Sequence, residues 1–185
     1  VISGGYANKI AANSWTATIA GGYFNDVGAN AAYGAIGGGF DNTIATNAQY
    51  ATIPGGLSNS ATNFAFAAGR RAKARHTGAF VWADSTDADF TSTANNQFLI
   101  RASGGVGIGT TSPQSPLDID INPGDASIRL RSGNLSWPVI LHQDAATSTF
   151  TITNGYALLA IEAAGNVGLG TNNPRNLLHL ADPAE

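Results

Sequence analysis

The stretch Ile19-Ala20-Gly21-Gly22-Tyr23-Phe24-Asn25 returns further along the chain as Ile36-Gly37-Gly38-Gly39-Phe40-Asp41-Asn42. Both copies run from Ile through a pair of Gly to a large apolar residue and then to Asn. The same order begins at Ile2 and at Ile53, so the step from each copy to the next is constant. A second apolar column falls between these Ile residues, at Ile10, Val27, Ile44 and Ala61. So many columns in one register identify an internal repeat, which is the sequence signature of a stacked architecture.

The repeat predicts an all-β fold in which each 17-residue coil contributes two short strands. The two apolar columns lie about half a coil apart, and Trp15–Ile19 and Gln49–Ile53 alternate with the period of two expected for strands. Gly and Asn suit the turns because they tolerate positive φ at low cost. Equal coils stack into a parallel solenoid with like residues about 4.8 Å apart, and stacked Asn side chains can hydrogen-bond along that axis. The residues expected to line the core are Ile2, Ile10, Ile19, Val27, Ile36, Ile44 and Ile53.

Such a coil has a thin core, because its inward positions hold mostly Ile, Ala and Gly. The column of Tyr6, Tyr23, Phe40 and Leu57 would stay uncovered in a single chain. A closed cyclic homo-oligomer covers such columns, because identical residues face one another around its axis. We therefore expect a homo-oligomer that has no folded monomer at ordinary concentrations.

The regular step ends after Ile53. Phe66-Ala67-Ala68-Gly69 corresponds to Ile53-Pro54-Gly55-Gly56 after a shorter step than the earlier ones, which predicts that the solenoid ends there. The expected boundaries are a roll over residues 1–77 and a neck over residues 78–116. Because the chain opens partway through a repeat, we expect it to be a fragment of a longer protein.

Residues 1 to about 85, with coils punctuated by Asn and Gly, resemble the heads of trimeric autotransporter adhesins. The most head-like part is Phe64-Ala65-Phe66-Ala67-Ala68-Gly69-Arg70-Arg71-Ala72-Lys73-Ala74. This resemblance implies a left-handed parallel β-roll and a homotrimer. It also implies a place on the outside of a bacterial cell, where the fibre meets a cell-surface receptor or glycan.

A second repeat lies downstream, where Val106-Gly107-Ile108-Gly109-Thr110 returns as Val167-Gly168-Leu169-Gly170-Thr171. The motif resembles linkers that recur in phage tail fibres and in long bacterial surface fibres. Thr110 or Thr111, followed by Ser112-Pro113, predicts the cap and first turn of a short helix.

The segment between the two motifs predicts a small antiparallel β module over residues 117–163. Its apolar and polar residues alternate as in strands, and Asn154-Gly155 is a strong hairpin signal. Asn122-Pro123-Gly124-Asp125 predicts a second turn. Residues 164–185 then form the second linker.

Charged residues are scarce in the roll and gather at its expected end. Residues 1–69 hold only three of them, after which a basic run begins and acidic residues follow. This group, which we call the collar, consists of Arg70, Arg71, Lys73, Arg75, Asp84, Asp87 and Asp89. We expect its members to exchange ion pairs between chains and so to fix the junction with the downstream modules. The alternative is a basic patch for nucleic acid or sulfated glycan, but a wide basic face with interleaved aromatics is absent.

No pattern indicates a catalytic residue, a cofactor or a metal ion. The chain has no Cys, and its three His residues lie far apart in sequence. The Gly105-x-Gly107-x-Gly109 run has the wrong spacing for a dinucleotide loop, and Pro113 follows it. The net charge of −3 gives no general attraction to nucleic acid or anionic lipid. No apolar run approaches the roughly 20 residues that span a bilayer, so direct membrane insertion is not expected.

The sequence thus predicts a segment of a homotrimeric surface fibre or adhesin, with structural and receptor-binding roles and no catalysis. The alternative is a phage tail fibre or tail-like receptor-binding fibre, which the downstream motifs favour. An enzyme would need clustered carboxylates or basic groups in a groove, and the coils have almost no ionisable residues. Tyr33 and Tyr50 are candidates for stacking on sugars, but burial at a subunit interface is the favoured interpretation of both.

Overall fold

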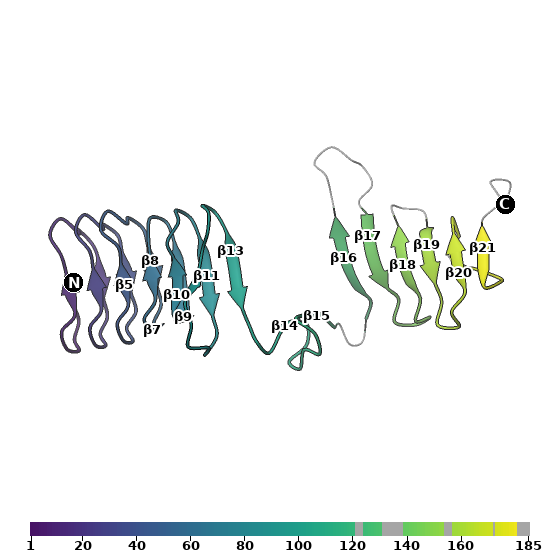
Figure 1. The fold of residues 1–185 in the computed structure, drawn as a ribbon, viewed down its shortest axis with the longest axis horizontal. Helices are drawn as coiled ribbons and strands as arrows, with labels where there is room; N and C mark the ends of the chain where they lie inside the picture. Colours follow the sequence, from purple (N-terminus) through teal and green to yellow (C-terminus); the bar gives the residue numbers. More distant parts are fainter. Residues whose placement is uncertain (121–123, 131–138, 154–156, 172, 181–185) are drawn as a thin grey trace. The chain divides into compact units, whose positions relative to one another are not determined.

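The computed structural model describes residues 1–120, 124–130, 139–153, 157–171 and 173–180. These residues form short β-strands joined by turns, so the fold is all-β as predicted (Figure 1). No helix among them is long and apolar enough to cross a membrane. The chain divides into two compact units, Val1–Ser103 and Gly104–Glu185.

Unit 1 is a parallel β-solenoid whose strands alternate between two sheets, as the repeat predicts. The first sheet, in spatial order, contains β1 (Lys9–Ile10), β3 (Asp26–Val27), β5 (Thr43–Ile44), β8 (Ser60–Ala61), β10 (Ala72–Ala74) and β12 (Phe90–Thr91). The second contains β2 (Thr18–Ile19), β4 (Ala35–Ile36), β6 (Thr52–Ile53), β9 (Phe66–Arg70), β11 (Phe80–Ala83) and β13 (Phe98–Arg101), with β7 (Gly56–Leu57) also beside β9.

The coils stack in the register that the repeat predicts. Ile19 pairs with Ile36 in the neighbouring parallel strand, and Ile36 pairs with Ile53. The fully buried members of the two core columns are Ile19, Val27, Ile36, Ile44 and Ile53. Ile10 is half-buried against this core, and Ile2, which was expected inside, is 42% exposed. Both residues belong to the first coil of the chain, so each has a neighbouring coil on one side only.

Each of the four regular coils adds one Asn to a continuous hydrogen-bonded ladder inside the solenoid, as predicted. Asn25 donates from its backbone N and its Nδ2 to Oδ1 of Asn8, at 3.0 and 3.1 Å. Asn42 makes the same two bonds to Asn25, and the backbone N of Asn59 continues the ladder to Asn42. The ladder satisfies buried backbone groups at the turn where each coil passes from one sheet to the other.

Two further details of the solenoid differ from the sequence predictions. The strands Thr18–Ile19 and Thr52–Ile53 have two residues each, where the alternating pattern predicted five. The solenoid also continues past residue 77, since Phe80–Ala83 and Phe98–Arg101 extend the second sheet. The shortened step is a local slip, because the step from Gly56 to its partner Gly69 is one residue shorter than the step from Thr52 to its partner Phe66.

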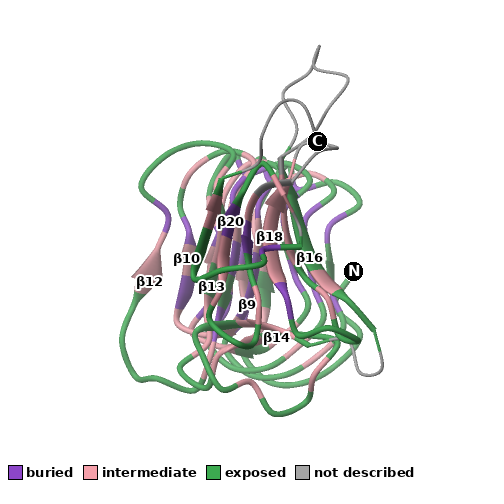
Figure 2. Ribbon diagram, turned by 90° about the vertical axis from the view of Figure 1, so that its right-hand side faces the viewer, coloured by how far each residue is buried: buried purple, intermediate pink, exposed green. Residues whose placement is uncertain are grey.

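In these later coils the fully buried core residues are smaller, because they are Ala and Val in place of Ile. These residues are Ala65, Ala67, Ala72, Ala74, Ala79, Val81 and Ala83. Figure 2 shows β10 coloured as buried, in agreement with the exposed fractions of Ala72 and Ala74. The thin core expected from composition is therefore present throughout the solenoid.

The described residues of unit 2 form two separate sheets. A small parallel one pairs β14 (Val106–Ile108) with β15 (Leu117–Ile119). A larger one runs antiparallel through β16 (Ala126–Leu130), β17 (Val139–Gln143), β18 (Phe150–Thr153), β19 (Ala157–Ile161) and β20 (Val167–Leu169), and β21 (Leu178–Leu180) joins β20 in parallel.

The antiparallel module predicted over 117–163 is therefore present with shifted limits. Its first expected strand, Leu117–Ile119, pairs instead with the first linker, and its sheet continues into the second linker through β20. The hairpin residues Asn154-Gly155 and the turn residues 122–123 lie outside the described residues, but β18 and β19 pair antiparallel as that hairpin requires.

The two V-G-[IL]-G-T motifs fold alike and contain no helix, so the predicted helix turn at Thr110–Pro113 is wrong. In each copy the motif strand pairs in parallel with the strand that follows it, and the step is the same: Val106 pairs with Leu117, and Val167 with Leu178. The Thr hydroxyl instead accepts the backbone N–H two residues later, in both copies at 3.1 Å. The chain thus turns back on itself at the Pro.

Candidate functional site

Apart from Arg70, which ends β9 and belongs to the collar, the outer face of the second sheet is uncharged and, in its later coils, strongly apolar. Because side chains alternate along a strand, the neighbours of the buried residues point outward. The outward columns contain Thr18, Ala35, Thr52, Phe66, Phe80 and Phe98, and further along the strands Ala68, Trp82 and Ile100. The ring of Phe80 stacks between Phe66 at 4.6 Å and Phe98 at 4.5 Å. Phe98 is 68% exposed and Trp82 is 38% exposed, and patches of this kind mark interaction surfaces.

The outer face of the first sheet differs sharply in its chemistry. Its outward column runs through Lys9, Asp26, Thr43, Ser60, Lys73 and Thr91. Lys9 and Asp26 lie 3.8 Å apart in this column. The outer face of the first sheet is therefore compatible with exposure to solvent, and the outer face of the second sheet is the candidate interface.

Aromatic ladders also follow the turns between the sheets. Tyr33 stacks on Tyr50 at 4.8 Å, and Tyr50 stacks on Phe64 at 5.1 Å, with the rings within 8° of parallel. A sugar stacks on the face of a ring, and in these ladders the faces cover one another. Both faces of the Tyr50 ring are covered in this way, and one face of the Tyr33 ring. The sugar-stacking interpretation is therefore weakened, above all for Tyr50, and burial at an interface remains the favoured one.

The collar forms a network of ion pairs within one chain. Asp87 contacts Arg70 at 2.9 Å and Arg71 at 3.5 Å. Asp89 contacts Arg71 at 2.8 Å, and it also lies within 4 Å of Lys73 and Arg75. Burial lowers the pKa of Lys73, the most enclosed of these bases. The basic groups expected to pair across chains already have acidic partners within their own chain.

Asp84 does not join this network, and its partner is a residue that the sequence analysis missed. Arg101 Nε lies 3.0 Å from Asp84 Oδ1, and its other nitrogens donate to the carbonyls of Arg70, Thr86 and Ala88. Asp84 also accepts the backbone N–H of Ser103, and this bond holds the pKa of Asp84 well below its usual range. Arg101 lies at the end of β13, well after the acidic residues in sequence. Only the pairing of β11 with β13 shows that it lies beside Asp84.

The structure predicts that Arg101, and not Arg71, is coupled to Asp84. Arg101→Ala and Asp84→Ala should each lower the melting temperature, and the double variant should lose less than the sum, since the two changes remove one shared contact. Because the pKa of Asp84 is lowered, its contribution is complete above about pH 4 and declines as the pH falls further. Thermal unfolding of the single and double variants measures the coupling.

The matched control is the pair Arg71→Ala and Asp84→Ala. Arg71 contacts Asp87 and Asp89, so its loss should add to the loss at Asp84. Coupling in the control pair with additivity at Arg101 would contradict the assignment.

No protein-family model matches the chain, and no curated protein matches it either. The described residues show a parallel β-solenoid with 17-residue coils followed by a mostly antiparallel sheet. Any statement of function depends on the surfaces and clusters of the chain itself.

Proposed function

We propose that the chain is a segment of a homotrimeric fibre or adhesin on a bacterial surface, with structural and receptor-binding roles and no catalytic one. The observation that carries the proposal is the division of charge between the two outer faces of the solenoid. The uncharged face, with Phe98 and Trp82 exposed, needs a cover, and other copies of the same chain supply it when three second sheets face a common axis. The left-handed sense of the coil, implied by the adhesin resemblance, belongs to the same proposal.

Unit 2 supports the proposal independently. One face of its antiparallel sheet carries Ile128, Leu130, Ile161 and Leu169, and each is more than a third exposed. An antiparallel sheet usually packs one face on a core. Association of three chains would cover this exposed face too.

The alternative is a phage tail fibre or tail-like receptor-binding fibre. The specific observation in its favour is that the two V-G-[IL]-G-T motifs fold alike, as repeated linkers of a long fibre would. It shares the homotrimer with the first proposal. A neighbouring region encoding a membrane β-barrel would favour the adhesin, and one encoding a virion-attachment or self-cleaving chaperone domain would favour the phage fibre.

The trimer is tested by light scattering coupled to gel filtration. We expect the mass of three chains, and Trp82→Lys or Ile100→Lys should dissociate them, because both residues lie on the uncharged face and a buried unpaired ammonium is costly. Thr43→Lys on the first sheet is the control, and it should stay trimeric because Asp26 lies beside it. A stable, cooperatively folded monomer of 18.8 kDa would end the proposal.

A further inference from the structure

Three potential metal ligands lie on one face of the antiparallel sheet in unit 2. His142 belongs to β17 and Asp144 comes two residues later, so both side chains point to the same side. Asp125 directly precedes β16, whose first residue Ala126 pairs with Gln143, so Asp125 comes opposite Asp144. One ligand atom from each of Asp125, His142 and Asp144 lies within 4.8 Å of the other two.

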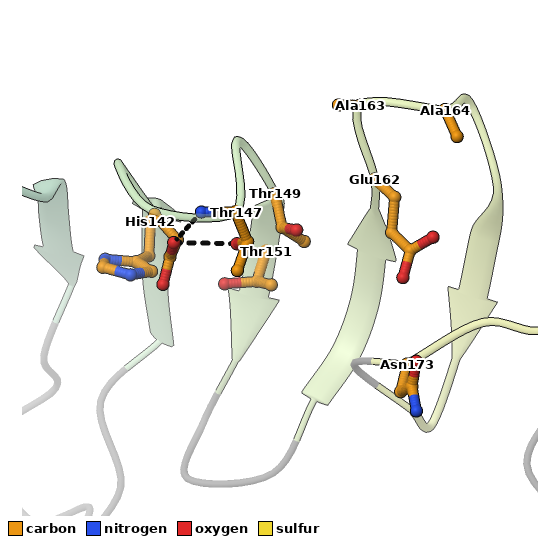
Figure 3. A pocket seen from close by; sticks show the side chains of 9 residues that line it. His142, Thr147, Thr149, Thr151, Glu162, Ala163, Ala164 and Asn173 are labelled. Atoms are coloured by element: carbon orange, nitrogen blue, oxygen red, sulfur yellow. Dashed lines mark hydrogen bonds between the residues drawn. The ribbon is translucent and has the colours of Figure 1, made fainter.

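This arrangement places two like charges side by side. Carboxylates directly opposite each other on neighbouring strands destabilise a sheet. The nearest basic group is the imidazole of His142, whose Nε2 is 3.6 Å from Asp125 Oδ2 and which is charged only when protonated. Among the described residues, no Lys or Arg pairs with Asp125 or Asp144. His142 and Asp144 also line a pocket together with Glu162, which adds further negative charge to it (Figure 3). A cation between these groups would replace repulsion by attraction.

Each of the two carboxylates accepts hydrogen bonds through its Oδ1 atom, which leaves its Oδ2 atom for a metal ion. Asp125 Oδ1 accepts the backbone N–H of Ala145 at 2.9 Å. Asp144 Oδ1 accepts from the N and Oγ1 of Thr147 at 2.6 and 2.7 Å, the two bonds drawn in Figure 3. Such outer hydrogen bonds orient the ligands of metal sites.

We propose that Asp125, His142 and Asp144 bind one divalent transition-metal ion, for which Zn²⁺ is the representative. The imidazole selects Zn²⁺ and its neighbours in the first transition row over Ca²⁺ and Mg²⁺. Three protein ligands leave a coordination position open, and water fills it from the pocket beside Thr149 and Thr151. All three ligands belong to one chain, so the site does not depend on the homotrimer.

Titration calorimetry of the full chain, first treated with chelator, tests the site with Zn²⁺. We expect one ion per chain. Thr147→Val should weaken binding about tenfold as an outer partner, and His142→Ala should weaken it more than about 100-fold as a direct ligand. His179→Ala is the matched control, because His179 is also half-buried in unit 2 but its Nδ1 accepts the N–H of Arg175. This control should bind Zn²⁺ as the parent chain does.

A spectroscopic measurement separates a lost ligand from a lost fold. Co²⁺ in place of Zn²⁺ should give visible absorption that disappears in His142→Ala while the far-ultraviolet circular dichroism stays unchanged. If His142→Ala fails to fold, Asp125→Asn carries the same comparison. The proposal is overturned if the parent chain binds no Zn²⁺ below about 1 mM. Equal losses in His142→Ala and His179→Ala would also overturn it.

Discussion

Replacing Ile36 by Asp is expected to abolish folding of the solenoid. Ile36 is 1% exposed and is stacked between Ile19 and Ile53, so a carboxylate there would lie in the core without a partner. An unpaired buried charge costs several kcal/mol, which is comparable with the roughly 5–15 kcal/mol that stabilise a whole domain. Far-ultraviolet circular dichroism and gel filtration of the purified variant measure the effect.

Ala35→Asp is the matched control, one residue away on the same strand. Ala35 points outward on the uncharged face, so its variant should leave the core intact and weaken assembly if that face is the interface. It should then fold at high protein concentration and unfold on dilution, whereas Ile36→Asp should stay unfolded at every concentration. The contrast separates the core from the proposed interface within one strand. A soluble, normally assembled Ile36→Asp protein would show that the register of the coils is wrong.

The regular part of the solenoid could be predicted because each coil places one residue of each kind in each column. Ile19, Ile36 and Ile53 carry the same role in successive coils, so the pattern states their stacking directly. The later coils lack the Asn and the Gly pair, and their register follows the column of Phe66, Phe80 and Phe98. The sequence analysis ended the solenoid too early because the repeat step changes near Gly69. The columns of the later coils are therefore out of step with the 17-residue columns before them.

The local signals were weaker where tertiary pairing decided the structure. Thr, Ser and Pro suit both a helix start and a turn, and at Thr110–Pro113 the pairing of β14 with β15 requires the turn. The same reason explains the metal cluster. Asp125 and His142 are far apart in sequence, and the alignment of β16 with β17 brings them together.

The collar shows another limit of the sequence. Opposite charges near each other in sequence predict ion pairs but not whether the partners belong to one chain or to two. Here the loop that holds Asp87 and Asp89 folds back over β10, and the pairs form within the chain. Apart from Lys73, the residues of this network are about half-exposed. An exposed ion pair contributes roughly 0–1 kcal/mol to stability, so a single pair has little weight.

The Asn ladder is the second place where one substitution should have a large effect, and Asn42→Asp tests it. Asn42 is fully buried, and its Nδ2 donates to Asn25 Oδ1, Gly38 O and Gly56 O, each at 3.0 Å. A carboxylate oxygen in the same place would face three acceptors and donate to none. Each buried group left without a partner costs about 1–3 kcal/mol, and the buried charge adds to this. We expect a loss of about 4 kcal/mol or more at neutral pH, measured by denaturant unfolding.

The loss should depend on pH with a defined sign. Burial among acceptors raises the pKa of the introduced carboxyl above its unfolded value of about 3.9, so the destabilisation grows as the pH rises above that value. Below it, the protonated acid donates one hydrogen bond and part of the stability returns. The control is Asn30→Asp, since Asn30 is exposed, has a positive φ of 56°, and donates a single side-chain bond to Asn47. Asp tolerates that backbone conformation, so the control should change little. Equal losses in the two variants would show that the amide ladder stabilises the solenoid no more than an exposed turn does.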